Sequence, residues 1–303
     1  MGLADYLHET FVQHALLAAT LVAITSGLIG PFVVTRKAAF AVHGTAELSF
    51  TGAAAGLLID GDPVLGALVG SLVVATAIGL LGARERERDS AIGVILAFGL
   101  GAGVYLLTFY HGFATEATNI LFGQIFGVSN QQLLILIAVA VAVLIAMVAL
   151  YRPLLFASVD PDVAEARGIP NRAVGLLFLY VLAFTVTEAA QIVGTLLVLS
   201  LAITPAAAAQ RLSARPAIVT ALSITFALIA ADGGLLTSLQ TNIKASVLVT
   251  AISFGLYLTA RGLGTVTRSQ RRPTPTTDLA ADPKHPAAPD RTGTTKPRGA
   301  TIS

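Results

Sequence analysis

The hydrophobic and polar positions divide most of the chain into long apolar stretches separated by short charged breaks. Most of these stretches approach the roughly 20 residues that a helix needs to cross the hydrocarbon core of a bilayer. Backbone polar groups within lipid must be satisfied inside the chain, so runs this apolar predict helices. The nine predicted stretches lie near residues 11–33, 38–59, 63–83, 90–110, 132–151, 172–190, 192–210, 216–236 and 245–260.

This pattern predicts an all-α polytopic membrane protein with about nine transmembrane helices. The sixth and seventh stretches are separated only weakly, around Glu188 to Gln191, so a count of eight stays open. Composition agrees, because 55% of the residues are hydrophobic and 12% are charged, whereas soluble domains carry roughly a quarter charged residues. The chain has no cysteine, which excludes disulfides and thiolate metal sites.

The positive charges give the expected orientation. All but one of the 19 Lys and Arg residues follow the first, third, fifth, seventh and ninth stretches or lie in the tail, and Lys244 is the exception. The positive-inside rule makes that crowded side cytoplasmic. We therefore expect a multi-pass protein of the cell membrane with its N-terminus outside and its C-terminus in the cytoplasm. The net charge of +2 needs no nucleic-acid partner.

The same pattern divides the chain into two parts of different composition. Residues 1–265 form the predicted transmembrane domain. Residues 266–303 are rich in Pro, Thr, Ala, Arg and Asp and show no apolar periodicity. Such a composition predicts a disordered cytoplasmic tail.

Ionisable residues inside the spans are the strongest functional candidates, because they are costly in lipid. His43 and Glu47 lie four residues apart in the second stretch, which places them about 40° apart on one helical face. An imidazole nitrogen and a carboxylate oxygen so placed can hold zinc or manganese. The alternative is a His–Glu hydrogen bond that locks two helices together, and the pair alone leaves both interpretations open.

Three other residues within the spans have two interpretations each. Glu188 and Asp232 lie near the outer ends of their stretches, where they line an outer vestibule or sit at the membrane interface. Pro205 interrupts the seventh stretch, where proline removes a backbone hydrogen bond. The interruption predicts either a packing kink or a hinge.

A cytoplasmic loop carries the signals of a short capped helix. Asp160 suits the N-cap and Pro161 the first helical position. Asp162 and Glu165 lie toward the positive end of the helix dipole, and Gly168 can adopt the left-handed conformation that ends a helix. The loop therefore predicts a rigid helix of about two turns, which suits a lever that docks into a partner.

Four segments together resemble the membrane subunits of zinc-, manganese- and iron-type metal-ion ABC transporters. Members of that permease family show four features in order. The first is an apolar-Arg-Arg stretch before a Gly-Asp-x-x-x-His motif, and the second is an acid-x-x-x-Gly opening of a helix. The third is a Leu-Phe-Gly-Asp motif, and the fourth is a coupling segment followed by Val-Gly-x-Leu-Leu and Pro-Ala-Ala. The first corresponding segment here is 32–37, continuing to Gly52, the second is 89–93 and the third is 121–124. The fourth combines 160–162, Ala164 and Gly168 with the later stretches 193–197 and 205–209.

The resemblance implies a permease dimer, of identical or different subunits, around a central pathway. Cytoplasmic ATP-binding subunits would drive it, and an extracytoplasmic metal-binding protein would deliver zinc, manganese or iron as cargo, with no permanently bound cofactor. The family's metal-pathway acid and histidine correspond to His43 and Glu47, although neither position keeps the family's usual residue. The short helix near 161–167 corresponds to the family's coupling helix.

The predicted function is therefore the permease subunit of an ATP-driven importer for a divalent metal ion. The chain has no Gly-x-x-x-x-Gly-Lys-Ser/Thr loop, so ATP hydrolysis belongs to a partner and the chain itself is not an enzyme. One alternative is an ion-gradient-driven transporter with Glu47, Glu188 and Asp232 as relay groups. Another is an ABC permease for an iron chelate or a vitamin. An intramembrane metalloprotease is disfavoured, because no His-Glu-x-x-His motif is present.

Overall fold

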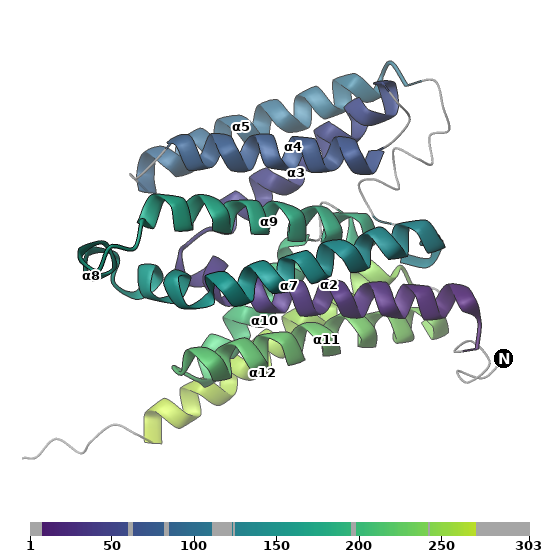
Figure 1. The fold of residues 1–303 in the computed structure, drawn as a ribbon. Coiled ribbons are helices and arrows are strands. Elements are labelled where there is room, and N and C mark those ends of the chain that lie inside the picture. Colours follow the sequence, from purple (N-terminus) through teal and green to yellow (C-terminus); the bar gives the residue numbers. More distant parts are fainter. Residues whose placement is uncertain are drawn as a thin grey trace, which may run out of the picture. The chain divides into compact units, whose positions relative to one another are not determined.

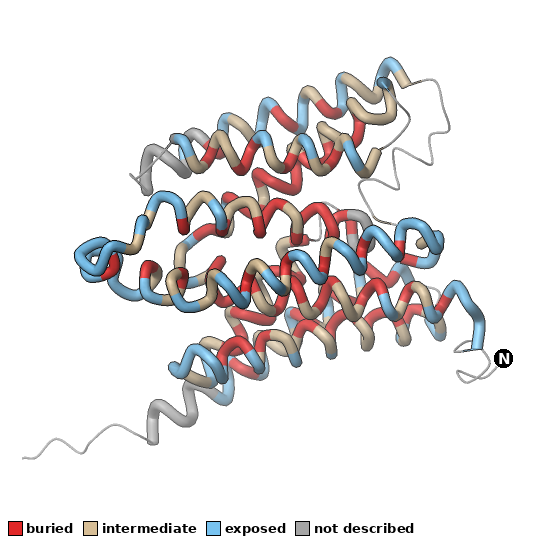
Figure 2. Tube along the Cα trace, viewed as in Figure 1, coloured by how far each residue is buried: buried red, intermediate tan, exposed pale blue. Residues whose placement is uncertain are grey.

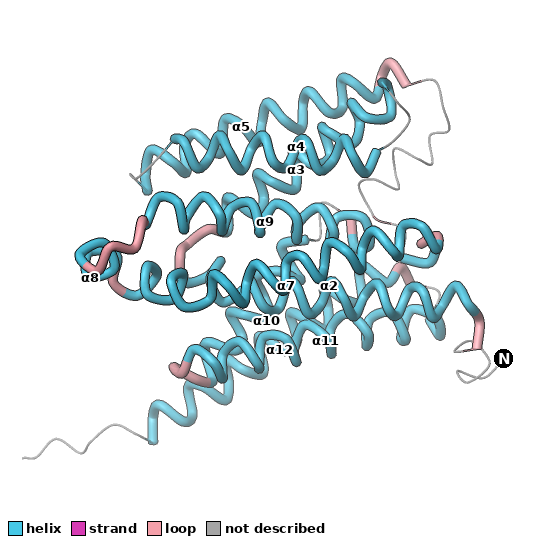
Figure 3. The backbone as a smooth tube through the Cα atoms, viewed as in Figure 1, coloured by secondary structure: helices cyan, strands magenta, loops and turns pink. Residues whose placement is uncertain are grey.

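The computed structural model describes residues 8–59, 63–81, 85–110, 123, 125–194, 198–241 and 243–270. These residues form helices and no β-strand (Figures 1 and 3). The helices are α2 (Thr10–Thr35), α3 (Ala39–Ile59), α4 (Pro63–Leu81), α5 (Glu85–Leu107), α7 (Asn130–Val159), α8 (Pro161–Ala166), α9 (Asn171–Val193), α10 (Val198–Leu212), α11 (Pro216–Thr241) and α12 (Ala245–Gln270), with a 3₁₀ turn η1 (Ile125–Gly127).

Each of the nine predicted stretches coincides with one helix of the described chain, which confirms the all-α class. Six of these helices, α2, α4, α7, α9, α11 and α12, are long and apolar enough to cross a membrane. The apolar parts of α5 and α10 are shorter, at Ile92–Leu107 and Val198–Leu212. The nine predicted stretches are therefore nine separate helices in the described residues, with α8 in addition, while nine crossings stay a prediction.

The break between α9 and α10 falls later than the sequence pattern placed it. The polar residues from Glu188 onward do not end the helix, and α9 continues to Val193. It ends where Gly194 takes a φ of 91°, a conformation that glycine adopts without steric cost. Backbone geometry, rather than the polarity of Glu188, therefore separates the two helices.

Helix α3 lies inside the bundle, in contact with α4, α5, α9 and α10. Figure 2 shows that much of it is buried. This enclosed position accounts for the composition of α3, which is not among the six helices that are apolar enough to cross a membrane. A helix enclosed by other helices can carry polar residues that would be costly against lipid, and α3 carries both His43 and Glu47.

Glycines bring α3 and α4 into direct backbone contact. A Cβ atom on Gly52 would overlap the carbonyl oxygen of Gly66, and a Cβ on Gly66 would overlap that of Gly52. Such close approach replaces the hydrophobic effect as the source of helix association in lipid. Helix α5 joins the same group through the Thr51 hydroxyl, which donates to the Gly99 carbonyl at 2.5 Å.

Substituting Gly52 with Ala should therefore destabilise the protein, because the new methyl group forces α3 and α4 apart. Overpacking of this kind costs about 1–3 kcal/mol. Gly93→Ala is the matched control, since nothing lies within 4 Å of a Cβ there and alanine favours a helix over glycine by about 1 kcal/mol. Thermal unfolding in detergent should show a lower melting temperature for the first variant only. Equal stability of both variants would contradict the close approach of α3 and α4.

Helices α7, α10 and α11 pack on α2, and α12 lies against α11 and α10. Helix α2 contacts α11, α10 and α7, while α9 contacts both α4 and α7 and so joins the two groups (Figure 1). Three aromatic rings connect these helices at one point. The Phe32 ring of α2 meets Tyr151 of α7 edge-on at a centroid distance of 5.4 Å and Phe178 of α9 at 6.5 Å.

Candidate functional site

His43 and Glu47 lie one turn apart on the enclosed helix α3. The Glu47 side chain is 4% exposed, and His43 is half-buried and interacts electrostatically with it. Two of their polar atoms, His43 Nδ1 and Glu47 Oε2, are fully buried and have no hydrogen-bond partner within the described residues. The structure therefore brings together the two residues that the sequence singled out.

Unpaired buried polar atoms are rare and costly in folded proteins, at about 1–3 kcal/mol each. A cation near His43 and Glu47 would satisfy both atoms, because an imidazole nitrogen and a carboxylate oxygen are both metal ligands. The alternative interpretation, a His–Glu hydrogen bond through these atoms, is disfavoured, because both remain unpaired. The arrangement of His43 and Glu47 is thus suited to binding a cation.

The pair supplies only part of a coordination shell. No group of three or more His, Cys, Asp or Glu residues that could hold a metal occurs in the described part of the chain. Resident structural zinc sites have four protein ligands, whereas a passing ion must bind weakly enough to leave. Two ligands therefore fit a transported cation better than a resident one.

The predicted short helix is present as α8. The Asp160 carboxylate accepts the backbone N–H of Val163 at 3.1 Å, and Pro161 occupies the first turn. After the helix, Gly168 has a φ of 80°, and the Ile169 N–H donates to the Ala164 carbonyl at 3.0 Å. The capping chemistry inferred from the sequence is therefore confirmed at both ends.

Helix α8 is an exposed stub held between α7 and α9. The Asn171 side-chain amide donates to the Pro161 carbonyl at 2.6 Å, and Ala164 is fully buried at the base. Asp162 and Glu165 are exposed. The outer face of α8 is therefore open to a partner, while its base is fixed to the bundle.

One connection near α8 was not recognised from the sequence. The Arg36 guanidinium at the end of α2 donates to the Ser158 hydroxyl of α7 at 3.4 Å. The same guanidinium lies 5.8 Å from the centre of the Phe178 ring of α9, within the range of a cation–π interaction. Arg36 therefore connects α2 to both helices that flank α8. Its sequence signal, a cation after an apolar stretch, indicated only a topological anchor.

The other candidates lie on helices other than α3. Asp232 of α11 accepts the Thr20 hydroxyl of α2 at 3.2 Å, so this acid links two helices. Pro205 is buried within α10, and its role as a hinge stays a prediction. Residues 121, 122 and 124 of the third resembling segment, and the tail beyond residue 270, lie outside the described residues.

Comparison with known proteins gives the family context. The profile of the ABC 3 transport family matches residues 8–263. A manganese transport system membrane protein, MntC from Halalkalibacterium halodurans, is 30% identical over 255 residues, which cover 84% of this chain and 87% of the relative. The high-affinity zinc uptake system membrane protein ZnuB from Haemophilus influenzae is 25% identical, over 80% of this chain and 94% of the relative.

A solved structure is also similar. The chain aligns with a protein in the structure of PsaBC from Streptococcus pneumoniae in complex with Fab, with a TM-score of 0.78 and 28% identity. The alignment covers 85% of this chain and 94% of that one. The similarity therefore spans the helical part of the chain and is not confined to one motif.

Proposed function

Because this chain belongs to the ABC 3 transport family, we propose that it is the membrane permease subunit of an ATP-driven importer for a divalent metal ion, manganese or zinc. The family match over residues 8–263 carries the proposal. The relatives named for manganese and zinc transport support the cargo. A gradient-driven transporter has no comparable support. The chain lacks a phosphate-binding loop, so a separate ATP-binding subunit supplies the hydrolysis.

His43 and Glu47 are the proposed pathway residues. The two unpaired atoms attract the cation, and the remaining ligands come from water and from a second permease subunit across a central pathway. An incomplete shell lets the ion leave when the helices move. An extracytoplasmic metal-binding protein delivers the ion to the outer side. An imidazole–carboxylate pair accepts both zinc and manganese, in agreement with the two kinds of relative.

The proposed topology places α8 where ATP is hydrolysed. Nine crossings with the N-terminus outside put α8 and residues 266–303 in the cytoplasm. The exposed face of α8 then docks into a cleft of the ATP-binding subunit. Closure of that subunit moves α7 and α9, and Arg36 passes the movement to α2. Pro205 is the proposed hinge of α10, because proline leaves one helical carbonyl without its partner.

Cells that lack this protein should accumulate less manganese or less zinc when that metal limits growth. The expected loss is specific to one or both of these metals, because the pair has the ligand types for them. Elemental analysis of cells grown with manganese, zinc and iron limiting in turn measures it, with the restored gene as control. Unchanged content of both manganese and zinc would overturn the proposed function.

A further inference from the structure

Two arginines and a tyrosine meet at the ends of α10 and α12, on the side of the bundle that the proposed topology places in the cytoplasm. Arg211 lies in the last turn of α10. Tyr257 and Arg261 lie four residues apart near the end of the apolar part of α12, Ala245–Leu263. The Tyr257 hydroxyl has both guanidinium groups as hydrogen-bonding neighbours. These three side chains form the Arg–Tyr cluster.

The two positive charges of the Arg–Tyr cluster have no acid to balance them. Neither α10 nor α12 contains Asp or Glu, and Asp232 is the only acid between residues 198 and 270. Asp232 lies in the second half of α11 and accepts the Thr20 hydroxyl of α2. Residues 266–303 carry seven Lys or Arg residues and three Asp residues, so the tail adds positive charge rather than negative charge.

The Arg–Tyr cluster has the chemistry to hold an anion. Guanidinium groups bind phosphate through two parallel N–H donors. A phenol hydroxyl both accepts and donates, so a tyrosine oxygen that accepts from arginine still has its own hydrogen to donate. The three side chains therefore bring several donors to one place. An anion bound there would also reduce the repulsion between two like charges that share one tyrosine.

Apolar side chains adjoin the cluster. Leu212 directly follows Arg211, and Leu258 directly follows Tyr257. Leu212 is 39% exposed and Leu258 is 50% exposed, and Leu263 at the end of the span is 61% exposed. Cationic groups beside exposed apolar side chains match a molecule that has an anionic headgroup and apolar tails. Basic pockets between transmembrane helices on the cytoplasmic side bind anionic lipid headgroups, and tyrosine is enriched at this depth.

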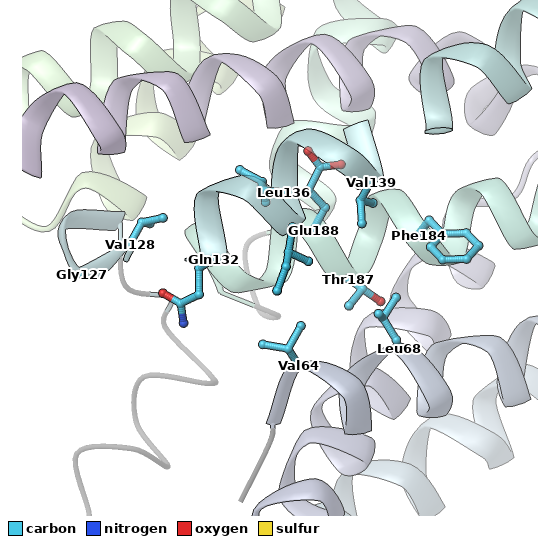
Figure 4. Close-up of a pocket in the computed structure, with 11 residues that line it drawn as sticks. Val64, Leu68, Gly127, Val128, Gln132, Leu136, Val139, Phe184, Thr187 and Glu188 are labelled. Carbon is cyan, nitrogen blue, oxygen red and sulfur yellow. The ribbon is translucent and has the colours of Figure 1, made fainter. Parts of the chain in front are cut away.

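The cavity between α4, α7 and α9 has a different character (Figure 4). Apolar side chains such as Leu68 and Leu136 form most of its wall, and its polar residues are Gln132, Thr187 and Glu188. None of the described residues along this wall is cationic. The cavity therefore does not attract an anion, and the Arg–Tyr cluster does.

We propose that the Arg–Tyr cluster binds the phosphate of one anionic phospholipid at the cytoplasmic surface of the membrane. The phosphate lies between the guanidinium groups of Arg211 and Arg261 and accepts the Tyr257 hydroxyl. The acyl chains lie along the exposed leucines. The bound lipid holds the end of α12 against α10, and this role uses the proposed topology but does not depend on the imported metal.

Phosphatidylglycerol should raise the melting temperature of the protein purified in detergent, in complex with its ATP-binding subunit where the two copurify. A ligand that binds only the folded state stabilises it as the site fills, so we expect a saturable rise of a few degrees. Phosphatidylcholine with the same acyl chains controls for the apolar tails. Inorganic phosphate tests whether the anion alone is sufficient. Neither should reproduce the rise.

Changing Arg211 and Arg261 to Gln in one chain should abolish the rise, because both charged donors are lost. Tyr257→Phe should need about tenfold more lipid for half of the rise, since one hydrogen bond to a charged group is lost. Arg215→Gln is the matched control. Arg215 is exposed in the turn after α10 and is not among the groups that act on Tyr257, so this variant should respond like the wild type.

The melting temperature without added lipid shows whether each variant folds. Tyr257→Phe removes only a hydroxyl group, so it keeps the test decisive if the double variant does not fold. No step measures metal transport, so the result is separate from that of the proposed function.

Five results would overturn the site. The first is a wild-type protein that does not respond to phosphatidylglycerol, and the second is an equal response to phosphatidylcholine. The third is a rise that inorganic phosphate alone reproduces, which would indicate a site for a free anion. The fourth is a wild-type response in the double variant or in Tyr257→Phe. The fifth is a loss in Arg215→Gln as large as in the double variant, which would indicate a general effect of surface charge.

Discussion

Changing His43 to Ala and Glu47 to Gln in one chain should abolish metal uptake while the transporter still assembles. His43→Ala removes the imidazole and Glu47→Gln removes the carboxylate charge, at the two residues whose buried atoms are unpaired within the described residues, so the cation loses its imidazole and carboxylate ligands on α3. Loss of groups that merely support a metal ligand costs about 10–100-fold in affinity or activity, and loss of the ligands themselves should cost at least as much. Uptake of radioactive manganese or zinc into cells or proteoliposomes measures the effect.

Thr45→Ala is the matched control on the same helix. Thr45 is fully buried, and within the described residues its hydroxyl donates to the Ala41 carbonyl of its own helix, at 2.7 Å. Its loss should leave uptake close to that of the wild type. Copurification of the ATP-binding subunit checks assembly for all variants. Normal uptake by the double variant at normal assembly would remove His43 and Glu47 from the pathway.

Changing Glu165 to Pro should separate ATP hydrolysis from transport. Proline at this position removes the N–H that would bond to the Pro161 carbonyl, the same carbonyl that Asn171 holds. Proline in a helix interior costs about 3 kcal/mol, which lowers the population of the helical form by about 100-fold. Without a rigid α8, closure of the ATP-binding subunit no longer moves α7 and α9. ATP hydrolysis and metal uptake measured on the same proteoliposomes should show hydrolysis persisting and uptake falling.

Glu165→Ala controls for the lost side chain. Glu165 is exposed, and alanine preserves the helix, so coupling should be retained. The paired variants therefore test the rigidity of α8 rather than the charge of one residue. Wild-type uptake in Glu165→Pro would show that α8 is not the coupling element.

The architecture was predictable only in part. Glycines spaced four apart indicated close helix packing, and the contact of Gly52 with α4 follows that expectation. The end of α9 was misplaced, because polarity at Glu188 suggested a break that the backbone makes at Gly194. The difference arises because a buried polar residue can continue a helix whenever its neighbours are protein rather than lipid.

The candidate sites were likewise predictable from the sequence only in part. The pairing of His43 with Glu47 was predictable, because four residues on one helix fix their relative position. The burial of Glu188 was not predictable from the sequence. The residues that surround it come from α4 and α7, and its neighbour Thr25 belongs to α2. The connection of Arg36 to Ser158 was equally hidden, since 122 residues separate the two along the chain.

The sequence by itself determined the helical class, the capped helix α8 and the His43–Glu47 face. These features depend on interactions within one helix or on the solvation of a single segment, which local composition controls. Only the tertiary structure decided that α3 is enclosed, that Arg36 connects three helices and that Glu188 is buried beside Thr25 of α2. These properties arise where segments distant along the chain exclude solvent together, and no local pattern records which segments will meet.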